Sequence, residues 1–119
     1  MKTMNRLMLK SYKCFEPQVV DIPEPKKGEV LVKVSHLGVC GSDIPRVWGD
    51  AAHFFPVVLG HEFSGVVTAV GEGVTDFQVG DRILCGPPSH CAEDCPSCQR
   101  GETNICINGF PRTAGIGGP

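Results

Sequence analysis

The sequence is dominated by short apolar segments that glycine and proline interrupt at close intervals. The 119 residues include 15 glycines and 10 prolines, and no stretch carries the long amphipathic repeat of a core helix. Residues 29–40, EVLVKVSHLGVC, place valine at alternate positions, which is typical of a β-strand. Short strands separated by turn residues predict a mainly β barrel or sandwich.

Further strands are predicted on both sides of this segment. Residues 6–22 alternate loosely between apolar and polar side chains, and predict two short strands with Glu16 and Pro17 near the turn. Residues 62–70, EFSGVVTAV, predict another strand. The sequence FQVGDRILCGP predicts a Gly-Asp turn followed by a short strand through residues 83–84.

Composition narrows the class of protein. A hydrophobic fraction of 41% with 20% charged residues suits one globular domain of ordinary size. The net charge of −2 gives no reason to expect nucleic acid or an anionic membrane as partner. No apolar run approaches the roughly 20 residues of a membrane span, and the basic start lacks the apolar stretch of a signal peptide. The seven cysteines are therefore expected in the cytosol, where clustered thiols more often bind metal than form disulfides.

Four cysteines lie close together in CAEDCPSCQRGETNIC, with three, two and seven residues between them. Four thiolates can surround one zinc ion tetrahedrally, and short spacings let each turn contribute two sulfurs. Such a site is closed to water and has a structural role. The alternatives are thiols without metal on a mobile loop, or a redox pair. The cysteines are Cys91, Cys95, Cys98 and Cys106.

A second candidate metal site combines two distant motifs, GVCGSD and LGHEFSG. They contain Cys40, His61 and Glu62, which are the ligand types of a catalytic zinc with one open position. Gly41 and Gly60 would let the backbone bend around the ion. The alternative is a buried apolar thiol and a hydrogen-bonded core histidine.

Together these motifs resemble the zinc-dependent medium-chain dehydrogenases, the alcohol and polyol dehydrogenase superfamily. PKKGEVLVKV, GVCGSD, PVVLGHEFSGVVTAVGEGV and VGDRI stand in family order and precede the four-cysteine lobe. CGSDIPRVW and AAHFFPVVLGHEFSG look most like the galactitol-1-phosphate 5-dehydrogenases and sorbitol dehydrogenases. The resemblance implies a GroES-like catalytic domain, a partly open β-barrel, over residues 1–119, with a zinc lobe at residues 91–106.

The resemblance also implies roles for single residues. Cys40 and His61 would ligate the catalytic zinc, and Glu62 would ligate it or face it through water. Ser42 would bind the substrate alcohol and start a proton relay. From the residues themselves, Ser42 or Asp43 is also a candidate N-cap for a helical turn in GSDIPRVWG. The four lobe cysteines would hold the structural zinc.

The implied enzyme transfers hydride from a polyol or sugar alcohol, with or without phosphate, to NAD, and is a homo-oligomer when full length. Arg46 is a candidate phosphate anchor, or alternatively an exposed arginine. The family often has a relay histidine where this chain has Ile44, Pro45 and Arg46. No dinucleotide fingerprint is present, and the remaining zinc ligand would lie beyond residue 119. We therefore expect an N-terminal fragment that is inactive alone.

A different class of protein is also consistent with these features. A free-standing β module stabilised by zinc would need the cysteine lobe and could serve binding, without catalysis. A zinc-ribbon nucleic-acid binder fits less well, because the lobe lacks surrounding basic residues. The presence of Cys40, Ser42, His61 and Glu62 favours the enzyme.

Overall fold

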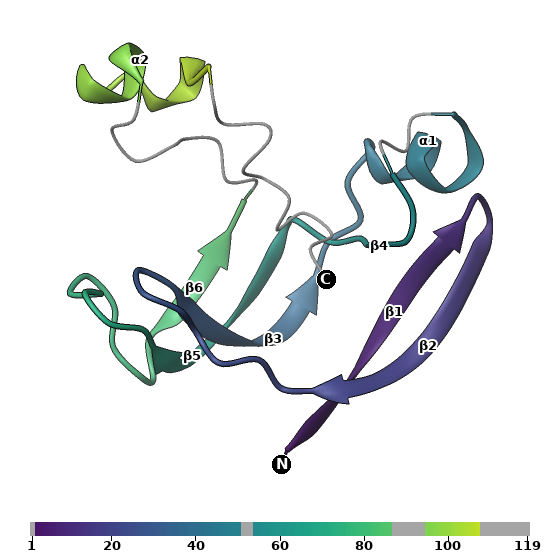
Figure 1. The fold of residues 1–119 in the computed structure, drawn as a ribbon, viewed down its shortest axis with the longest axis horizontal. Helices are drawn as coiled ribbons and strands as arrows, with labels where there is room; N and C mark the ends of the chain where they lie inside the picture. Colours follow the sequence, from purple (N-terminus) through teal and green to yellow (C-terminus); the bar gives the residue numbers. More distant parts are fainter. Residues whose placement is uncertain (1, 51–53, 87–94, 108–119) are drawn as a thin grey trace.

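Two three-stranded antiparallel sheets make up most of the fold (Figure 1), with strand orders β2-β1-β4 and β3-β5-β6. The computed structural model describes residues 2–50, 54–86 and 95–107. The strands are β1 (Thr3–Ser11), β2 (Cys14–Asp21), β3 (Val30–Leu37), β4 (Val57–Val58), β5 (Phe63–Val70) and β6 (Arg82–Cys85). The helices are α1 (Asp43–Trp48), α2 (Pro96–Gln99) and the 3-10 helix η1 (Thr103–Ile105).

This arrangement confirms the mainly β, open fold. The strands predicted from alternating valines and from the Gly-Asp turn are present as β3, β5 and β6, and the helical turn after Cys40 is present as α1. In the described part of the chain, even α1 has only six residues, and none of the helices there has the length and apolar character needed to span a membrane.

The turn of the N-terminal hairpin differs from the prediction. It lies at Tyr12 and Lys13, between β1 and β2, and Lys13 adopts a φ of 62°, a left-handed conformation that non-glycine residues adopt only occasionally. Glu16 and Pro17, which were predicted near the turn, lie within β2. Proline is tolerated there because β2 is an edge strand and need not donate to a second neighbour.

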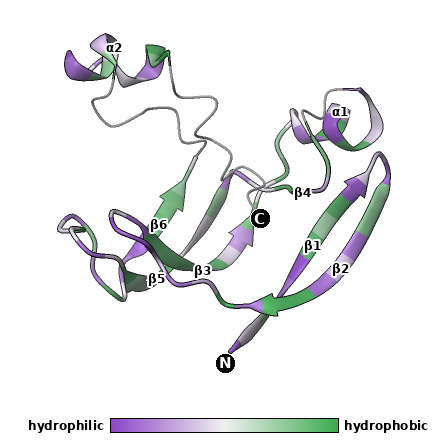
Figure 2. Ribbon diagram, in the orientation of Figure 1, coloured by the Kyte–Doolittle hydropathy of each residue, from purple (hydrophilic) through white to green (hydrophobic). Residues whose placement is uncertain are grey.

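The main core forms where β1 meets α1 and β4. Leu9 is completely buried and clusters with Val47 and Val57, and Phe55 and Leu59 pack against them. Leu9 is buried because side chains of α1 and β4 pack against it. Figure 2 shows hydrophobic segments along β1 and β6. The cluster ties the first sheet to the helix that follows Cys40.

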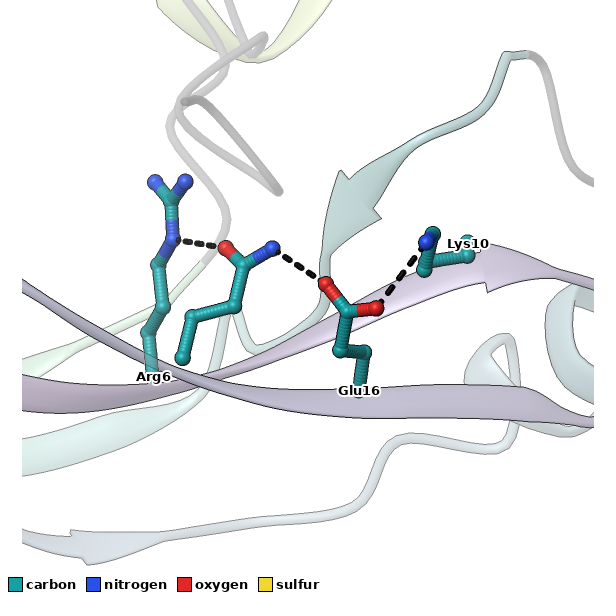
Figure 3. A network of polar contacts seen from close by, with 4 residues as sticks. Arg6, Lys10 and Glu16 are labelled. Atoms are coloured by element: carbon teal, nitrogen blue, oxygen red, sulfur yellow. Dashed lines mark hydrogen bonds and ion pairs between the residues drawn. The ribbon is translucent and has the colours of Figure 1, made fainter.

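A row of polar side chains crosses the β1–β2 hairpin (Figure 3). Arg6 Nε donates to Gln18 Oε1 at 2.9 Å, Gln18 Nε2 donates to Glu16 Oε1 at 2.8 Å, and Lys10 Nζ donates to Glu16 Oε2 at 2.9 Å. The hydrogen bonds from Gln18 and Lys10 lower the pKa of Glu16, and the bond to Glu16 raises the pKa of Lys10. The carboxylate therefore favours the fold at neutral pH, and that contribution is lost as the pH falls through the Glu16 pKa. The effect is small because both groups are exposed.

Candidate metal centres

The pairing of β3 with β5 brings the two predicted metal-binding motifs together (Figure 1). Leu37 at the end of β3 is paired with Phe63 at the start of β5. One residue further, the backbone N–H of Gly38 donates a 2.7 Å hydrogen bond to the carbonyl of Glu62. Cys40 follows within two residues of this contact, and the His-Glu pair immediately precedes β5. Antiparallel neighbours thus carry both motifs to the same end of the sheet.

The ligand atoms of Cys40, His61 and Glu62 all lie within 4.8 Å of one another. His61 is buried, whereas Cys40 and Glu62 are half-buried, so the group lies at the surface with its imidazole inside the fold. Gly60, directly before His61, has a φ of 122°, which glycine adopts without the cost that a Cβ would impose. Gly41 shows no positive φ, so only Gly60 makes the predicted sharp bend.

Asp43 connects two of these residues. Its Oδ2 accepts a 3.0 Å hydrogen bond from the backbone N–H of Cys40, and its Oδ1 lies 3.7 Å from Nδ1 of His61. Metal-binding histidines usually present their second ring nitrogen to a carboxylate or carbonyl, which fixes the ring. With Nδ1 facing Asp43, the other nitrogen of His61, Nε2, is left to face an ion.

From the sequence, Asp43 was predicted only as a candidate N-cap. The structure instead places Ser42 at the N-cap position and buries the carboxylate of Asp43 beside a ligand. The only signal in the sequence was a carboxylate three residues after Cys40, and nothing there linked it to His61.

Zinc fits this group of residues. His61 Nδ1 and Asp43 Oδ1 are buried and have no hydrogen-bond partner among the described residues, although buried polar groups are normally paired. A zinc ion on the imidazole would account for a buried, oriented ring that faces a carboxylate. Thiolate, imidazole and carboxylate are all zinc ligands, and three of them leave one position for a water or substrate oxygen.

Ser42 is exposed at the start of α1, two residues after Cys40. Its side chain makes no capping hydrogen bond to the helix, so the hydroxyl is not committed to the helix end. This position is compatible with the predicted contact to a substrate alcohol, which stays a prediction.

The second group consists of lobe cysteines on α2 and η1, which are seen apart from the two sheets in Figure 1. Ligand atoms of Cys95, Cys98 and Cys106 lie within 4.8 Å of one another. Cys95 and Cys98 are buried and are not joined by a disulfide. Cys91, the fourth predicted ligand, lies outside the described residues.

The sulfur spacing suits a tetrahedral zinc. Cys95 Sγ and Cys106 Sγ are 3.8 Å apart. Four sulfurs placed about 2.3 Å from one zinc would be separated by about 3.8 Å along each edge of the tetrahedron. Within the described part of the lobe, the cluster around the two buried cysteines contains Cys106 besides them.

Replacing Cys98 with serine should remove about one zinc per chain and lower the melting temperature, because metal binding by such a lobe is coupled to its folding. Elemental analysis and thermal unfolding measure the two effects. Cys14→Ser, which changes an exposed cysteine of the hairpin, is the matched control and should change neither. Unchanged zinc content in Cys98→Ser would remove the lobe assignment.

Replacing Asp43 with asparagine should weaken metal binding at Cys40 and His61 about 10- to 100-fold, the usual effect of losing a carboxylate behind a histidine ligand. Competition with a chromogenic chelator measures the affinity, and the lobe should keep its metal. Asp21→Asn, at the exposed end of β2, is the control. An Asp43→Asn protein with unaltered affinity would show that the carboxylate does not support a metal ligand.

A protein-family model, the alcohol dehydrogenase GroES-like domain, matches residues 26–119. The S-(hydroxymethyl)glutathione dehydrogenase of Photobacterium damsela subsp. piscicida is 51% identical over 89 residues, which make up 74% of this chain and 24% of that protein. The chain thus spans about a quarter of the length of the curated relatives it matches.

Solved structures with the same fold include three dehydrogenases. Galactitol-1-phosphate dehydrogenase from Escherichia coli has a TM-score of 0.79 and 40% identity over 87% of this chain and 30% of that chain. A short chain alcohol dehydrogenase from E. coli CFT073, complexed with NADH, has a TM-score of 0.76 and 38% identity over 87% and 30%. A cobalt- and zinc-bound thermostable alcohol dehydrogenase from Pyrobaculum aerophilum has a TM-score of 0.78 and 30% identity over 91% of this chain and 33% of that chain.

These comparisons confirm the GroES-like fold and the family that the ordered motifs had indicated, and support zinc and a nicotinamide as the cofactors of that family. Because the family model covers most of the sequence and the described strands follow the same fold, this chain belongs to the alcohol dehydrogenase family as a GroES-like domain.

Proposed function

We propose that residues 1–119, with a structural zinc lobe at residues 91–106, form the catalytic domain of a zinc-dependent enzyme that transfers hydride from a polyol or sugar alcohol to NAD. The observation that carries this proposal is the convergence of Cys40, His61 and Glu62 within 4.8 Å. Three protein ligands leave room for a substrate oxygen, whereas a four-cysteine site is closed. Since the chain covers 24% of a curated relative, the NAD-binding part would belong to a longer protein.

In this proposal each residue of the group has a separate task. Cys40, His61 and Glu62 hold zinc, which when bound supplies a Lewis acid that makes an alcohol proton easier to remove. Asp43 keeps the imidazole of His61 in position. The hydroxyl of Ser42 accepts the alcohol proton and passes it to solvent, since Ser42 is exposed. A bound nicotinamide would supply the hydride acceptor, so that oxidation at the carbinol carbon would give a ketone or aldehyde.

We further propose that the substrate is anionic and that Arg46 binds its charged group. The names of two similar proteins describe an alcohol on a charged molecule, galactitol-1-phosphate and S-(hydroxymethyl)glutathione. Arg46 is half-buried on α1, about one helical turn beyond Asp43. A guanidinium offers paired N–H donors that match a phosphate or carboxylate.

The proposed setting is the cytoplasm, because thiolate ligands require reduced cysteines. We also propose a homo-oligomer. Leu84 on β6 and Val39 after β3 expose 87% and 76% of their surface, and apolar surface of this kind is normally covered by further chain or by a second subunit.

Cys40→Ser and His61→Ala, each made in the complete subunit, should abolish alcohol-dependent NADH formation and leave about one zinc per subunit in the lobe. The open site depends on these ligands and the closed lobe does not. NADH absorbance and elemental analysis measure the two quantities, with Cys14→Ser as the active control. Full turnover in either variant would contradict the proposal. It would also be contradicted if the unmodified subunit oxidised no alcohol, and that result would favour a binding module.

Arg46→Gln should raise KM for phosphorylated polyols about tenfold or more, because a lost hydrogen bond to a charged group typically costs about 1.5–3 kcal/mol. The KM for the same polyol without phosphate is the internal control and should change little. An equal change for both substrates would assign Arg46 a role in the fold and none in recognition of the anion.

A further inference from the structure

The connection between the two metal-binding motifs has two arms, and both touch the N-terminal hairpin (Figure 1). The first arm is α1, which follows Cys40, and the second is the segment from Phe55 to β4, which leads to His61. Neither arm belongs to the β3–β5 pair that carries the ligands. Asp43 ties the start of the first arm to the metal group, and the far end of that arm needs a separate structural support.

The turn of the hairpin contacts both arms through adjacent residues. The backbone N–H of Lys13 donates a 2.9 Å hydrogen bond to the carbonyl of Val47, one of the last carbonyls of α1, which have no partner within a helix. The ring of Tyr12 meets the ring of Phe55 edge to face, with centroids 4.9 Å apart and an interplanar angle of 87°, a favourable geometry for an aromatic pair.

Strand β1 also contacts both arms, through a side chain in the core. Leu9, which is fully buried, clusters with Val47 of α1 and Val57 of β4, and it is also paired with Val57 in the sheet. The two strands of the hairpin are joined by their antiparallel ladder, and the polar row of Figure 3 also links them. The same hairpin therefore contacts both arms.

The metal ligands contact the first residue of α1 and the end of the β3–β5 pair. Asp43, which begins α1, accepts the N–H of Cys40 and faces His61, and Glu62 is held through its carbonyl by Gly38. The hairpin turn contacts the other end of α1, at Val47, so a small change in the turn would move Arg46 more than it would move Asp43 and the ligands.

We propose that the ring of Tyr12 and the backbone N–H of Lys13 hold α1 and the Phe55 segment at a fixed separation, so that Tyr12 is a positioning residue that places Arg46 for substrate binding. The substrate part of this inference rests on the proposed function. The contact of the turn with α1 does not, and the two parts are tested separately.

Trp48, the single tryptophan, ends α1 one residue after Val47 and reports on the helix in the 119-residue chain. Tyr12→Ala should lower the fluorescence anisotropy of Trp48 and increase its quenching by acrylamide, whereas Tyr12→Phe, which keeps the ring, should not. Two controls should resemble the unmodified chain. Phe15→Ala removes another partly exposed aromatic ring of the hairpin, and Lys13→Gly keeps the N–H and suits a φ of 62°. Unchanged Trp48 signals in a folded Tyr12→Ala chain would overturn the inference.

In the complete subunit, Tyr12→Ala should raise KM for the alcohol about two- to tenfold, as expected from losing one aromatic pair, with kcat and zinc content nearly unchanged. Tyr12→Phe should restore KM. A parallel fall of kcat and zinc, or an unchanged KM, would overturn the substrate part. If the unmodified subunit oxidises no alcohol, the proposed function fails and the substrate part fails with it, while the Trp48 measurements still decide whether the turn holds α1.

Discussion

The antiparallel pairing of β3 with β5 is the interaction on which the candidate active site depends. The pairing continues beyond the end of β3 and the start of β5 through the hydrogen bond from Gly38 to Glu62. Cys40 and the His-Glu pair therefore lie next to each other at this end of the sheet. The strands approach closely at Gly65, where an added Cβ would collide with the carbonyl oxygen of Lys33. A side chain there would force the strands apart. Because a shift by one residue would turn every side chain to the other face, this register determines which ligand atoms converge.

Burial of His61 restricts which groups can lie around its imidazole. An imidazole inside the fold must have partners for its nitrogens, since an unpaired buried polar group costs about 1–3 kcal/mol. Asp43 faces one nitrogen at 3.7 Å, and its other oxygen holds the backbone of Cys40. A single carboxylate thereby links two ligands that come from different strand ends. Zinc on the remaining nitrogen would complete the set, so the chemistry of the ion and the folding of this region are coupled.

The two metal centres differ in what holds them. The group at Cys40 and His61 is supported by the sheets, whose buried side chains Leu9 and Val67 are fully enclosed. Among the described residues, the cluster of the lobe contains cysteines alone, and its short elements α2 and η1 contact each other. In a cluster of this size, thiolate–metal bonds can take the place of a core. In the proposed enzyme, metal would therefore stabilise the lobe and serve the reaction at the other site.

The sequence by itself determined the local features. Alternating valines predicted β3, because strand propensity belongs to neighbouring residues, and residue type and motif predicted both groups of candidate ligands, because ligand chemistry belongs to the side chains themselves. The sequence did not reveal the turn at Lys13, since lysine carries no signal for a positive φ, or the role of Asp43, whose partner His61 belongs to the other motif. It also could not show that Tyr12 reaches Phe55 across the fold. These contacts were decided by the tertiary structure alone, because they depend on strand register and on which buried polar groups face each other after distant segments have packed.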